Sequence, residues 1–298
     1  MSEQGLSVDP LWPRAGGWSA PGAEDVDVAL VGIPTHATSL SPTGAHRTPA
    51  AVRDALRRYS AFAPGLDVES LRFADAGDVT APDGPEGRQR AIAAVDEAVS
   101  RSRLTVAIGG DNSLTVPTML GAVGPALATA GLITLDAHHD LRDGRSNGSP
   151  VRELLDAGLD GRRVVQIGIA DFANSAAYAR RAAEHGITVV TRDALHTRPI
   201  DDVMAEALEI AGAAGGPIHV DLDVDVCDRS VVPACPASIP GGLAAWELRR
   251  FARLAGASPL VRSVDIAEVD ATADAPDQRT VRLAALLILE AAAGLASR

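Results

Sequence analysis

The sequence has few aromatic residues, two cysteines and no long apolar segment. Phe, Trp and Tyr make up 3% of its 298 residues, so Ala, Val, Leu and Ile must build the core, and layers of such side chains can pack closely. Cys227 and Cys235 form no CxxC pair and suggest no disulfide framework, which fits a reducing cytoplasm. Because no run of about 18 apolar residues is present, we predict no transmembrane helix.

Positive charge is also in the minority, and the net charge is −12. An acidic chain repels phosphate backbones, so we expect no nucleic-acid partner. The polar, Pro- and Gly-containing stretch 1–17 lacks the apolar core of a signal peptide. We therefore expect a cytoplasmic protein that does not bind membranes, with residues 1–25 as a mobile arm or surface strap.

Short apolar runs alternate with helical patterns from about residue 26 to the C-terminus. The alternation predicts a mainly parallel eight-stranded sheet with helices on both faces. No linker or internal repeat interrupts it, so we expect a single domain over 26–298. In such sheets ligands bind beyond the carboxyl ends of the strands. The expected strands are 27–33, 71–75, 104–109, 131–137, 163–169, 187–191, 217–224 and 261–267, and the helices lie near 48–60, 86–102, 113–122, 149–158, 174–185, 200–214, 243–256 and 277–296.

The segment DAHHD, at 136–140, follows one of these strands. On an extended backbone, Asp136, His138 and Asp140 would share one face, with His139 facing the other way. Two carboxylates and an imidazole at one point would repel or stay protonated unless a cation neutralised them. This donor set suits Mn, Fe or Zn better than Ca. The alternative is a charged turn at a strand end, which so short a motif does not exclude.

A second acidic segment, DLDVDVCD at 221–228, ends the expected strand 217–224. Asp221, Asp223 and Asp225 alternate with apolar residues, and buried Asp is rare unless it is paired or binds a metal. The alternative is an edge strand with a solvated face. An EF-hand is rejected because the Gly at its sixth position and the Glu at its twelfth are absent. Together the two segments supply enough carboxylates for two metal ions about 3.5–4 Å apart, which predicts a metal-dependent hydrolase.

Three motifs in order resemble the signatures of the ureohydrolase family, which includes arginase and agmatinase: GGDNS at 109–113, DAHHD at 136–140, and DVDVCDRSVVPACPASIPGG at 223–242. The resemblance implies the three-layer α/β/α arginase–deacetylase fold, an amidine or guanidine substrate and a homo-oligomer. It also implies a dinuclear manganese centre with two Mn²⁺ ions per subunit, although another divalent metal is possible.

The resemblance also implies roles for single residues. Asp136 and Asp223 would bridge both ions. Asp140 would bind one ion, and His138 and Asp225 would bind the other. Asp140 would also carry the proton to the leaving amine. Glu268 matches the acidic residue that holds the substrate's amidine group in the family.

Two asparagines depart from the family pattern. Asn112 stands where the family usually has a histidine ligand, and a neutral amide oxygen is a weaker ligand for a transition metal than imidazole. Asn147 stands where arginases and agmatinases have a histidine that is thought to shuttle protons, which argues against arginine or agmatine as the substrate. A metal-binding pseudoenzyme is therefore an alternative, although the other ligands and Glu268 remain.

Basic residues near the expected rim of the site favour an acidic substrate. Arg142, Arg145 and Arg152 could bind carboxylates bidentately, with Asn147 beside them, although any one of these arginines alone is more often a surface residue. The segments SNGSPVRELL, VVQIGIADFANSAAYA and VPACPASIPGG resemble formimidoylglutamase-type members of the family. That resemblance implies hydrolysis of N-formimidoyl-L-glutamate, in histidine degradation, to L-glutamate and formamide.

Other activities of the same fold remain as alternatives. An agmatinase, a guanidinobutyrase or a guanidine hydrolase would release urea from its substrate. The deacetylase branch is a weaker alternative, because its pocket usually needs a His pair and a catalytic Tyr. The chain has only Tyr59 and Tyr178, and we expect neither of them to lie near the metal motifs.

Overall fold

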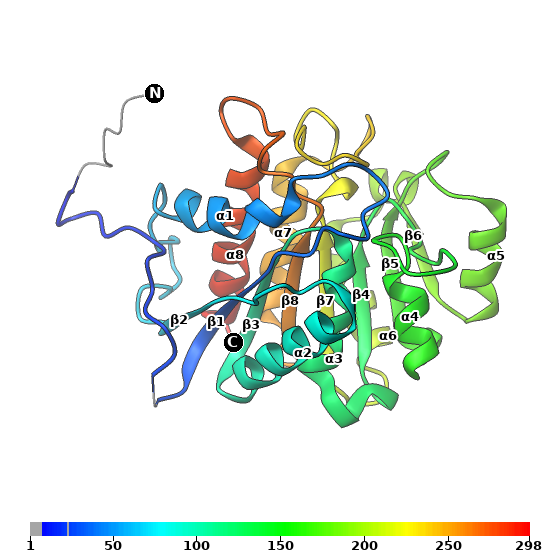
Figure 1. Ribbon diagram of the computed structural model, residues 1–298, viewed down its shortest axis with the longest axis horizontal. Coiled ribbons are helices and arrows are strands. Elements are labelled where there is room, and N and C mark those ends of the chain that lie inside the picture. Colours follow the sequence, from blue (N-terminus) through cyan, green and yellow to red (C-terminus); the bar gives the residue numbers. More distant parts are fainter. Residues whose placement is uncertain (1–7, 23) are drawn as a thin grey trace.

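The computed structural model describes residues 8–22 and 24–298, and it contains an eight-stranded sheet at its centre (Figure 1). All neighbouring strands pair in parallel, in the order β2-β1-β3-β8-β7-β4-β5-β6. The predicted parallel sheet is confirmed, with strand ends shifted by three residues at most. The strands are β1 (Val26–Ile33), β2 (Phe73–Asp78), β3 (Ser102–Gly109), β4 (Gly131–Leu135), β5 (Val164–Ile169), β6 (Thr188–Thr191), β7 (Ile218–Asp223) and β8 (Val261–Ala267).

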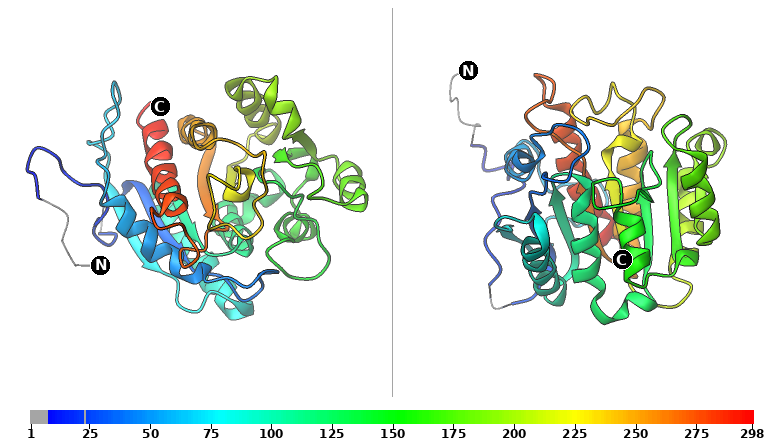
Figure 2. Two further views of the ribbon diagram at one scale, coloured as in Figure 1. Left: turned by 90° about the horizontal axis from the view of Figure 1, so that it is seen from above. Right: turned by 45° about the vertical axis from the view of Figure 1, so that its right-hand side comes forward.

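Helices cover both faces of this sheet, as Figure 2 shows. Helices α1, α6, α7 and α8 pack on one face, and α2, α3 and α4 pack on the other. None of the helices in the described ranges is both long and apolar enough to cross a membrane. The helices are α1 (Thr48–Leu56), α2 (Gly84–Ser100), α3 (Thr115–Val123), α4 (Pro150–Ala157), α5 (Ala176–Glu184), α6 (Ile200–Ala211), α7 (Ala245–Ala257) and α8 (Arg279–Leu295).

The scarcity of aromatic side chains lets α7 and α8 approach each other closely. A Cβ atom on Gly256 of α7 would lie 2.0 Å from the backbone oxygen of Ala291 on α8. Gly294 of α8 meets the backbone of Arg253 in the same way. Phe251, which is fully buried, is the large side chain that fills the layer between these helices and the sheet. Small residues thus set the distance between α7 and α8.

The described part of the N-terminal segment lies along the β2 edge of the sheet. The Trp18 ring stacks on Phe73 of β2, with ring centroids 4.2 Å apart. The backbone N–H of Ala15 donates to the oxygen of Tyr59 at 2.8 Å, and that of Asp75 donates to Ser19 at 2.9 Å. These contacts attach residues 15–19 to the neighbouring parts of the fold. Residues 1–7 and 23 lie outside the described residues.

Substitution of Phe251 tests the packed layer beneath α7. We expect Phe251→Ala to lower the free energy of unfolding by about 3–5 kcal/mol, because it leaves a cavity in a core with little room to collapse. Urea denaturation of the metal-free protein measures this loss without a contribution from bound metal. Trp246→Ala, on an exposed turn of the same helix, is the control and should change stability by about 0.5 kcal/mol or less. Equal losses for the two variants would contradict this packing.

Candidate metal centre and active site

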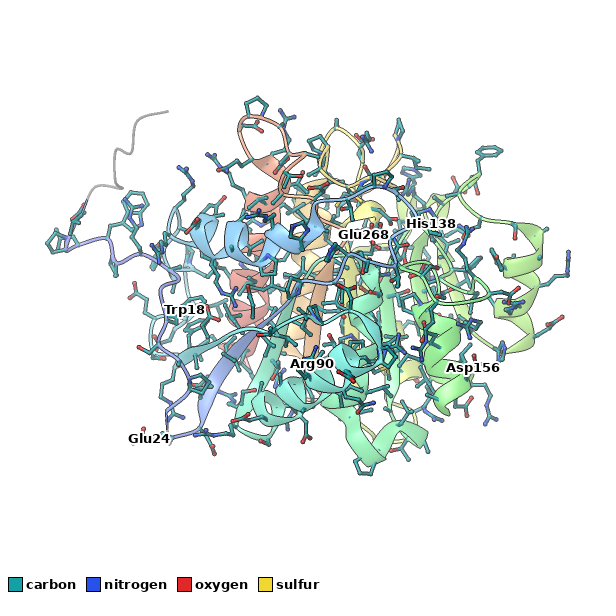
Figure 3. The ribbon with its side chains drawn as sticks, viewed as in Figure 1. Trp18, Glu24, Arg90, His138, Asp156 and Glu268 are labelled. Atoms are coloured by element: carbon teal, nitrogen blue, oxygen red, sulfur yellow. The ribbon has the colours of Figure 1, made fainter. Side chains whose placement is uncertain are left out.

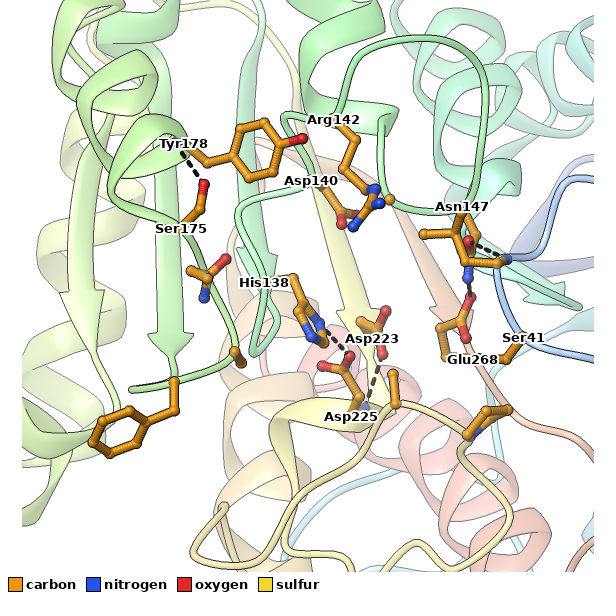
Figure 4. Close-up of a pocket in the computed structure, with 17 residues that line it drawn as sticks. Ser41, His138, Asp140, Arg142, Asn147, Ser175, Tyr178, Asp223, Asp225 and Glu268 are labelled. Carbon is orange, nitrogen blue, oxygen red and sulfur yellow. Dashed lines mark hydrogen bonds and ion pairs between the residues drawn. The ribbon is translucent and has the colours of Figure 1, made fainter.

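The sequence motifs meet because four strands that are distant in the sequence lie side by side. Strands β3, β8, β7 and β4 are consecutive in the sheet, and their carboxyl ends share one edge. A pocket of about 420 Å³ opens there (Figure 4); His138 and Glu268, which line it, are labelled in Figure 3. Of the predicted site residues, its lining contains His138, Asp140, Arg142, Asn147, Asp223, Asp225 and Glu268. Asp136 and Asn112 are buried directly behind these residues, and each bonds to one of them.

The backbone in the DAHHD segment is not extended, and that expectation is wrong. Strand β4 ends at Leu135, and Asp140 has a left-handed backbone with φ 52°. The segment's candidate ligands are therefore oriented by loop geometry and not by strand alternation. His139 points away from the pocket as expected, and its ring bonds to Gln166 in the interior.

Strand alternation also fails for the second acidic segment. Strand β7 ends at Asp223, and residues 224–226 form a 3-10 turn that carries Asp225 back beneath His138. Asp221 is not at the pocket. It is buried within the sheet, in register with Asp265 of β8. Two of the three aspartates thus reach the site.

One imidazole and two carboxylates form a ready cation site. His138 Nδ1 lies 2.7 Å from Asp225 Oδ2 and 3.5 Å from Asp136 Oδ1. One ligand atom from each of these side chains lies within 4.8 Å of the others. Asp225 is also fixed from behind, because its Oδ1 accepts from the Ala137 N–H at 2.9 Å. Imidazole with carboxylate oxygens is a donor set for a transition metal or zinc, so these residues fit one such ion.

The carboxylates of this cluster carry more negative charge than His138 can balance. Burial, with the nearby charge of Asp225, raises the pKa of Asp136 to about 7. Burial also holds the pKa values of Asp140 and Asp223 well above the usual range. Burial alone would lower the pKa of His138, but Asp225 and Asp136 raise it to about 12. A single imidazolium cannot neutralise four carboxylates, so the remaining ones must hold protons or bind cations.

Asn112 supports a candidate ligand in this arrangement. Its Nδ2 donates to Asp140 Oδ2 at 2.6 Å, and its side-chain oxygen accepts from the Thr115 hydroxyl at 2.8 Å. The amide oxygen is therefore engaged away from Asp140. This geometry favours a role for Asn112 in orienting Asp140 over a role as a metal ligand.

Glu268 is buried but keeps one oxygen free. Its Oε1 accepts from the Asn112 backbone N–H at 2.7 Å and from Asn147 Nδ2 at 2.8 Å. Its Oε2 has no hydrogen bond among the described residues, although the side chain lines the pocket. Burial raises the pKa of Glu268 to about 8, and its backbone is left-handed with φ 63°. Such strained conformations persist where the surroundings enforce them, often at functional sites.

The three predicted arginines lie in different surroundings. Arg142 lines the pocket, and its guanidinium has no hydrogen bond among the described residues (Figure 4). Arg145 pairs with Glu153 at 3.5 Å outside this pocket. Arg152 donates to the backbone oxygen of Arg142 at 2.8 Å and so supports the loop that carries it. Arg142 is thus the one arginine of the three that is available to a ligand in this pocket.

The loop after β5 supplies pocket residues that the sequence reasoning missed. Phe172, Asn174 and Ser175 of this loop line the pocket, together with Tyr178 of α5. The expectation that Tyr178 lies away from the metal motifs is wrong. Residues 170–175 also follow the end of a strand, so the rule that ligands bind beyond strand ends could have predicted that this loop lines the site. Of the five non-glycine residues with positive φ in the described ranges, three (Asp140, Phe172 and Glu268) line the pocket.

Comparison with known proteins matches residues 26–294 to the arginase family. A formimidoylglutamase from Halalkalibacterium halodurans is 35% identical over 271 residues, which cover 87% of this chain and 84% of the relative. The formimidoylglutamase structure from Bacillus subtilis superposes with a TM-score of 0.90 at 30% identity, covering 99% of this chain and 96% of that one. A formiminoglutamase from Trypanosoma cruzi, solved with Mn²⁺₂, gives a TM-score of 0.84 at 28% identity, with coverage of 94% and 97%.

Metal binding to the metal-free protein should release protons at neutral pH. The pKa of Asp136 is raised to about 7, and those of Asp140 and Asp223 are raised as well, so protons compete with metal below that pH. We expect the apparent affinity for Mn²⁺ to rise between about pH 6 and 8. Calorimetry in buffers of different ionisation enthalpy counts the protons released. A pH-independent affinity without proton release would contradict the raised pKa values.

Replacement of Asn112 tests its role beside Asp140. Asn112→His removes the hydrogen bond from the side-chain amide to Asp140 and adds an imidazole. We therefore expect the affinity for at least one Mn²⁺ ion to rise about tenfold or more. Titration followed by the EPR signal of free Mn²⁺ measures this change. Thr115→Val is the control, because it removes the hydroxyl that holds the amide but adds no ligand. Equal or weaker Mn²⁺ binding by Asn112→His would contradict the prediction.

Proposed function

The chain belongs to the arginase family, and from this premise we propose that it hydrolyses N-formimidoyl-L-glutamate to L-glutamate and formamide. The reaction is the hydrolysis of a C–N bond in a linear amidine. The similarity to formimidoylglutamases over most of both chains supports this substrate.

One observation about the pocket carries the proposal. Four of the candidate metal ligands share a single space of about 420 Å³ with Glu268 and Arg142, a volume typical of small-molecule sites. These four are His138, Asp140, Asp223 and Asp225. Glu268 complements a cationic amidine, whereas Arg142 complements a carboxylate. A molecule with an amidine at one end and carboxylates at the other satisfies both groups.

The metals that this proposal requires are two Mn²⁺ ions. Asp136 and Asp223 would be shared by both ions. His138 and Asp225 would complete the ligands of one ion, and Asp140 would bind the other. When bound, such ions lower the pKa of water so that hydroxide is available at neutral pH. The excess of buried carboxylates supports this assignment, because two divalent cations would neutralise it.

The side chains of the chain itself would bind and orient the substrate. Glu268 Oε2 accepts hydrogen bonds from the amidine N–H groups while Asn112 and Asn147 hold its other oxygen. Arg142 binds a carboxylate of the glutamate moiety. Asp140 Oδ2 is held by Asn112, so its Oδ1 is left to accept a hydrogen bond from the attacking water and to pass the proton to the leaving amine.

The second candidate function is hydrolysis of a guanidine with release of urea. Agmatine carries a second cation where an acidic substrate carries carboxylates, and Arg142 would repel it. An acidic guanidine would satisfy the same two ends of the pocket, so direct comparison of substrates must separate the two activities. A metal-binding pseudoenzyme predicts no turnover of any of them.

We also propose that residues 26–298 act as one domain, with 1–25 as an arm, in a cytoplasmic homo-oligomer. One unbroken sheet across residues 26–267 supports the domain. Free, buried Cys227 and Cys235 fit a reducing compartment. Exposed aromatic side chains, including Trp12 and Phe62, are of the type that protein interfaces use.

Turnover by the manganese-loaded protein tests the substrate. We expect glutamate release from N-formimidoyl-L-glutamate, and little or no product from arginine, agmatine, 4-guanidinobutyrate or guanidine run in parallel. Activity on a guanidine compound alone would replace the proposed substrate. If the protein binds two metal ions but turns over none of the five compounds, the result would favour the pseudoenzyme.

The role of Arg142 has its own test. Arg142→Met should raise KM for N-formimidoyl-L-glutamate about 10- to 100-fold, because a charge-assisted hydrogen bond contributes about 1.5–3 kcal/mol. Arg145→Met, from the same loop but outside the pocket, should change KM by about twofold or less. Steady-state kinetics of the two variants measures both values. An unchanged KM in Arg142→Met would contradict the role.

A further inference from the structure

The three asparagines of the chain all lie at this one site. Asn112 donates to Asp140, and Asn147 donates to Glu268. Each therefore orients a side chain that the proposed reaction uses. The third, Asn174, lines the pocket from the loop after β5, and its partners are backbone groups.

Asn174 bonds to the backbone on both sides of His138. Its Oδ1 accepts from the His139 N–H at 3.0 Å, and its Nδ2 donates to the oxygen of Ala137 at 2.8 Å. The same Nδ2 donates to the oxygen of Ala170 at 3.3 Å. A side-chain amide offers two N–H donors and one carbonyl acceptor, so both ends of this one are engaged. The amide thus bonds to the backbone groups before and after His138, in the pattern that a neighbouring β-strand would use.

These hydrogen bonds of Asn174 matter because residues 136–140 have no regular secondary structure. Their backbone groups need partners from elsewhere, and Gln166 supplies one by donating to the oxygen of His139 at 2.9 Å. Gln166 holds the interior side of the loop, whereas Asn174 holds the side that faces the pocket. The His138 ring itself is 30% exposed and is positioned by Asp225 and Asp136, so a shift of its backbone would move Nδ1 out of the cation site.

Asn174 also fastens the loop that forms the rim of the pocket. Phe172 in this loop has a left-handed backbone with φ 64° and a fully exposed side chain, which is uncommon for a bulky residue. Such a conformation persists when its surroundings over-determine it. The bond from Asn174 to Ala170 closes the loop on itself, and the bonds to Ala137 and His139 join it to the ligand loop.

We propose that Asn174 is a positioning residue that holds His138 in register with Asp225 and Asp136 at the metal site. The inference rests on the proposed function in one respect, namely that His138 binds metal. Outer hydrogen-bond partners of metal ligands commonly change affinity by about 10- to 100-fold. Asn174 thereby links the substrate-facing rim to the affinity of the site for its ion.

Two substitutions separate the parts of this role. Asn174→Asp keeps the size and the acceptor, but it sets a carboxylate oxygen against the carbonyl oxygens of Ala137 and Ala170. Asn174→Ala removes all the bonds and leaves a gap without new charge. Ser175→Ala is the matched control, because it perturbs the same loop through the α5 cap without touching the ligand loop.

The experiment measures Mn²⁺ binding by EPR titration of chelator-stripped protein, together with Tm and steady-state kinetics. We expect Mn²⁺ affinity to fall about 10- to 100-fold in Asn174→Asp and by a similar factor in Asn174→Ala, with wild-type affinity in Ser175→Ala. Excess Mn²⁺ should restore most of the kcat lost in Asn174→Ala. If Asn174→Asp does not fold, Asn174→Ala decides the outcome by itself.

Two results would overturn the positioning role. A raised KM with wild-type Mn²⁺ affinity would make Asn174 a direct substrate ligand. A lowered Tm with wild-type Mn²⁺ affinity, as in Ser175→Ala, would make it purely structural. Failure of the proposed function gives a different pattern, in which the wild type binds Mn²⁺ but turns over no amidine, and the comparison of metal affinities between variants still holds.

Discussion

The desolvation of clustered carboxylates is the constraint on which the rest of the site depends. Asp136, Asp140, Asp223 and Asp225 are nearly inaccessible to water and share one imidazole. Removing a carboxylate from water is costly unless an opposite charge or a hydrogen bond compensates. The protein supplies only part of that compensation, through His138 and backbone N–H groups. The remaining compensation must come from bound protons or cations. The fold therefore maintains a site whose negative charge is neutralised only when these are bound.

The parallel sheet makes such a cluster possible. Four consecutive strands, β3, β8, β7 and β4, each end at the same edge and deliver their following residues to one place. Gly256 and Gly294 let α7 and α8 pack closely against each other in the helix layer on one face of the sheet. A closely packed interior resists displacement of its side chains. A group of carboxylates needs such a rigid surrounding, because their mutual repulsion would otherwise push them apart.

Neutral amides complete the site where charged groups would add to its imbalance. Asn112, Asn147 and Asn174 donate to Asp140, Glu268 and the backbone beside His138. A histidine or lysine in these places could ionise and compete with a bound cation, whereas an amide donates hydrogen bonds without changing the net charge. The two departures from the family pattern, Asn112 and Asn147, therefore belong to a consistent hydrogen-bonding scheme around the ligands.

Local pattern in the sequence was enough to predict the eight strands, the helices between them and the acidic segments that meet at the pocket. Hydrophobic periodicity reports burial along a single element, and buried Asp in an apolar strand requires compensation wherever it lies. The same reasoning could not tell that β4 stops at Leu135, that Asp221 stays inside the sheet, or that Arg145 and Arg152 turn away from the pocket. The left-handed backbones of Asp140 and Glu268, and the arrival of Asn174 and Tyr178 at the pocket, depend on contacts between segments far apart in the chain. Those contacts form only when the strands have paired, because partners distant in sequence exert no influence on one another until the sheet brings them together.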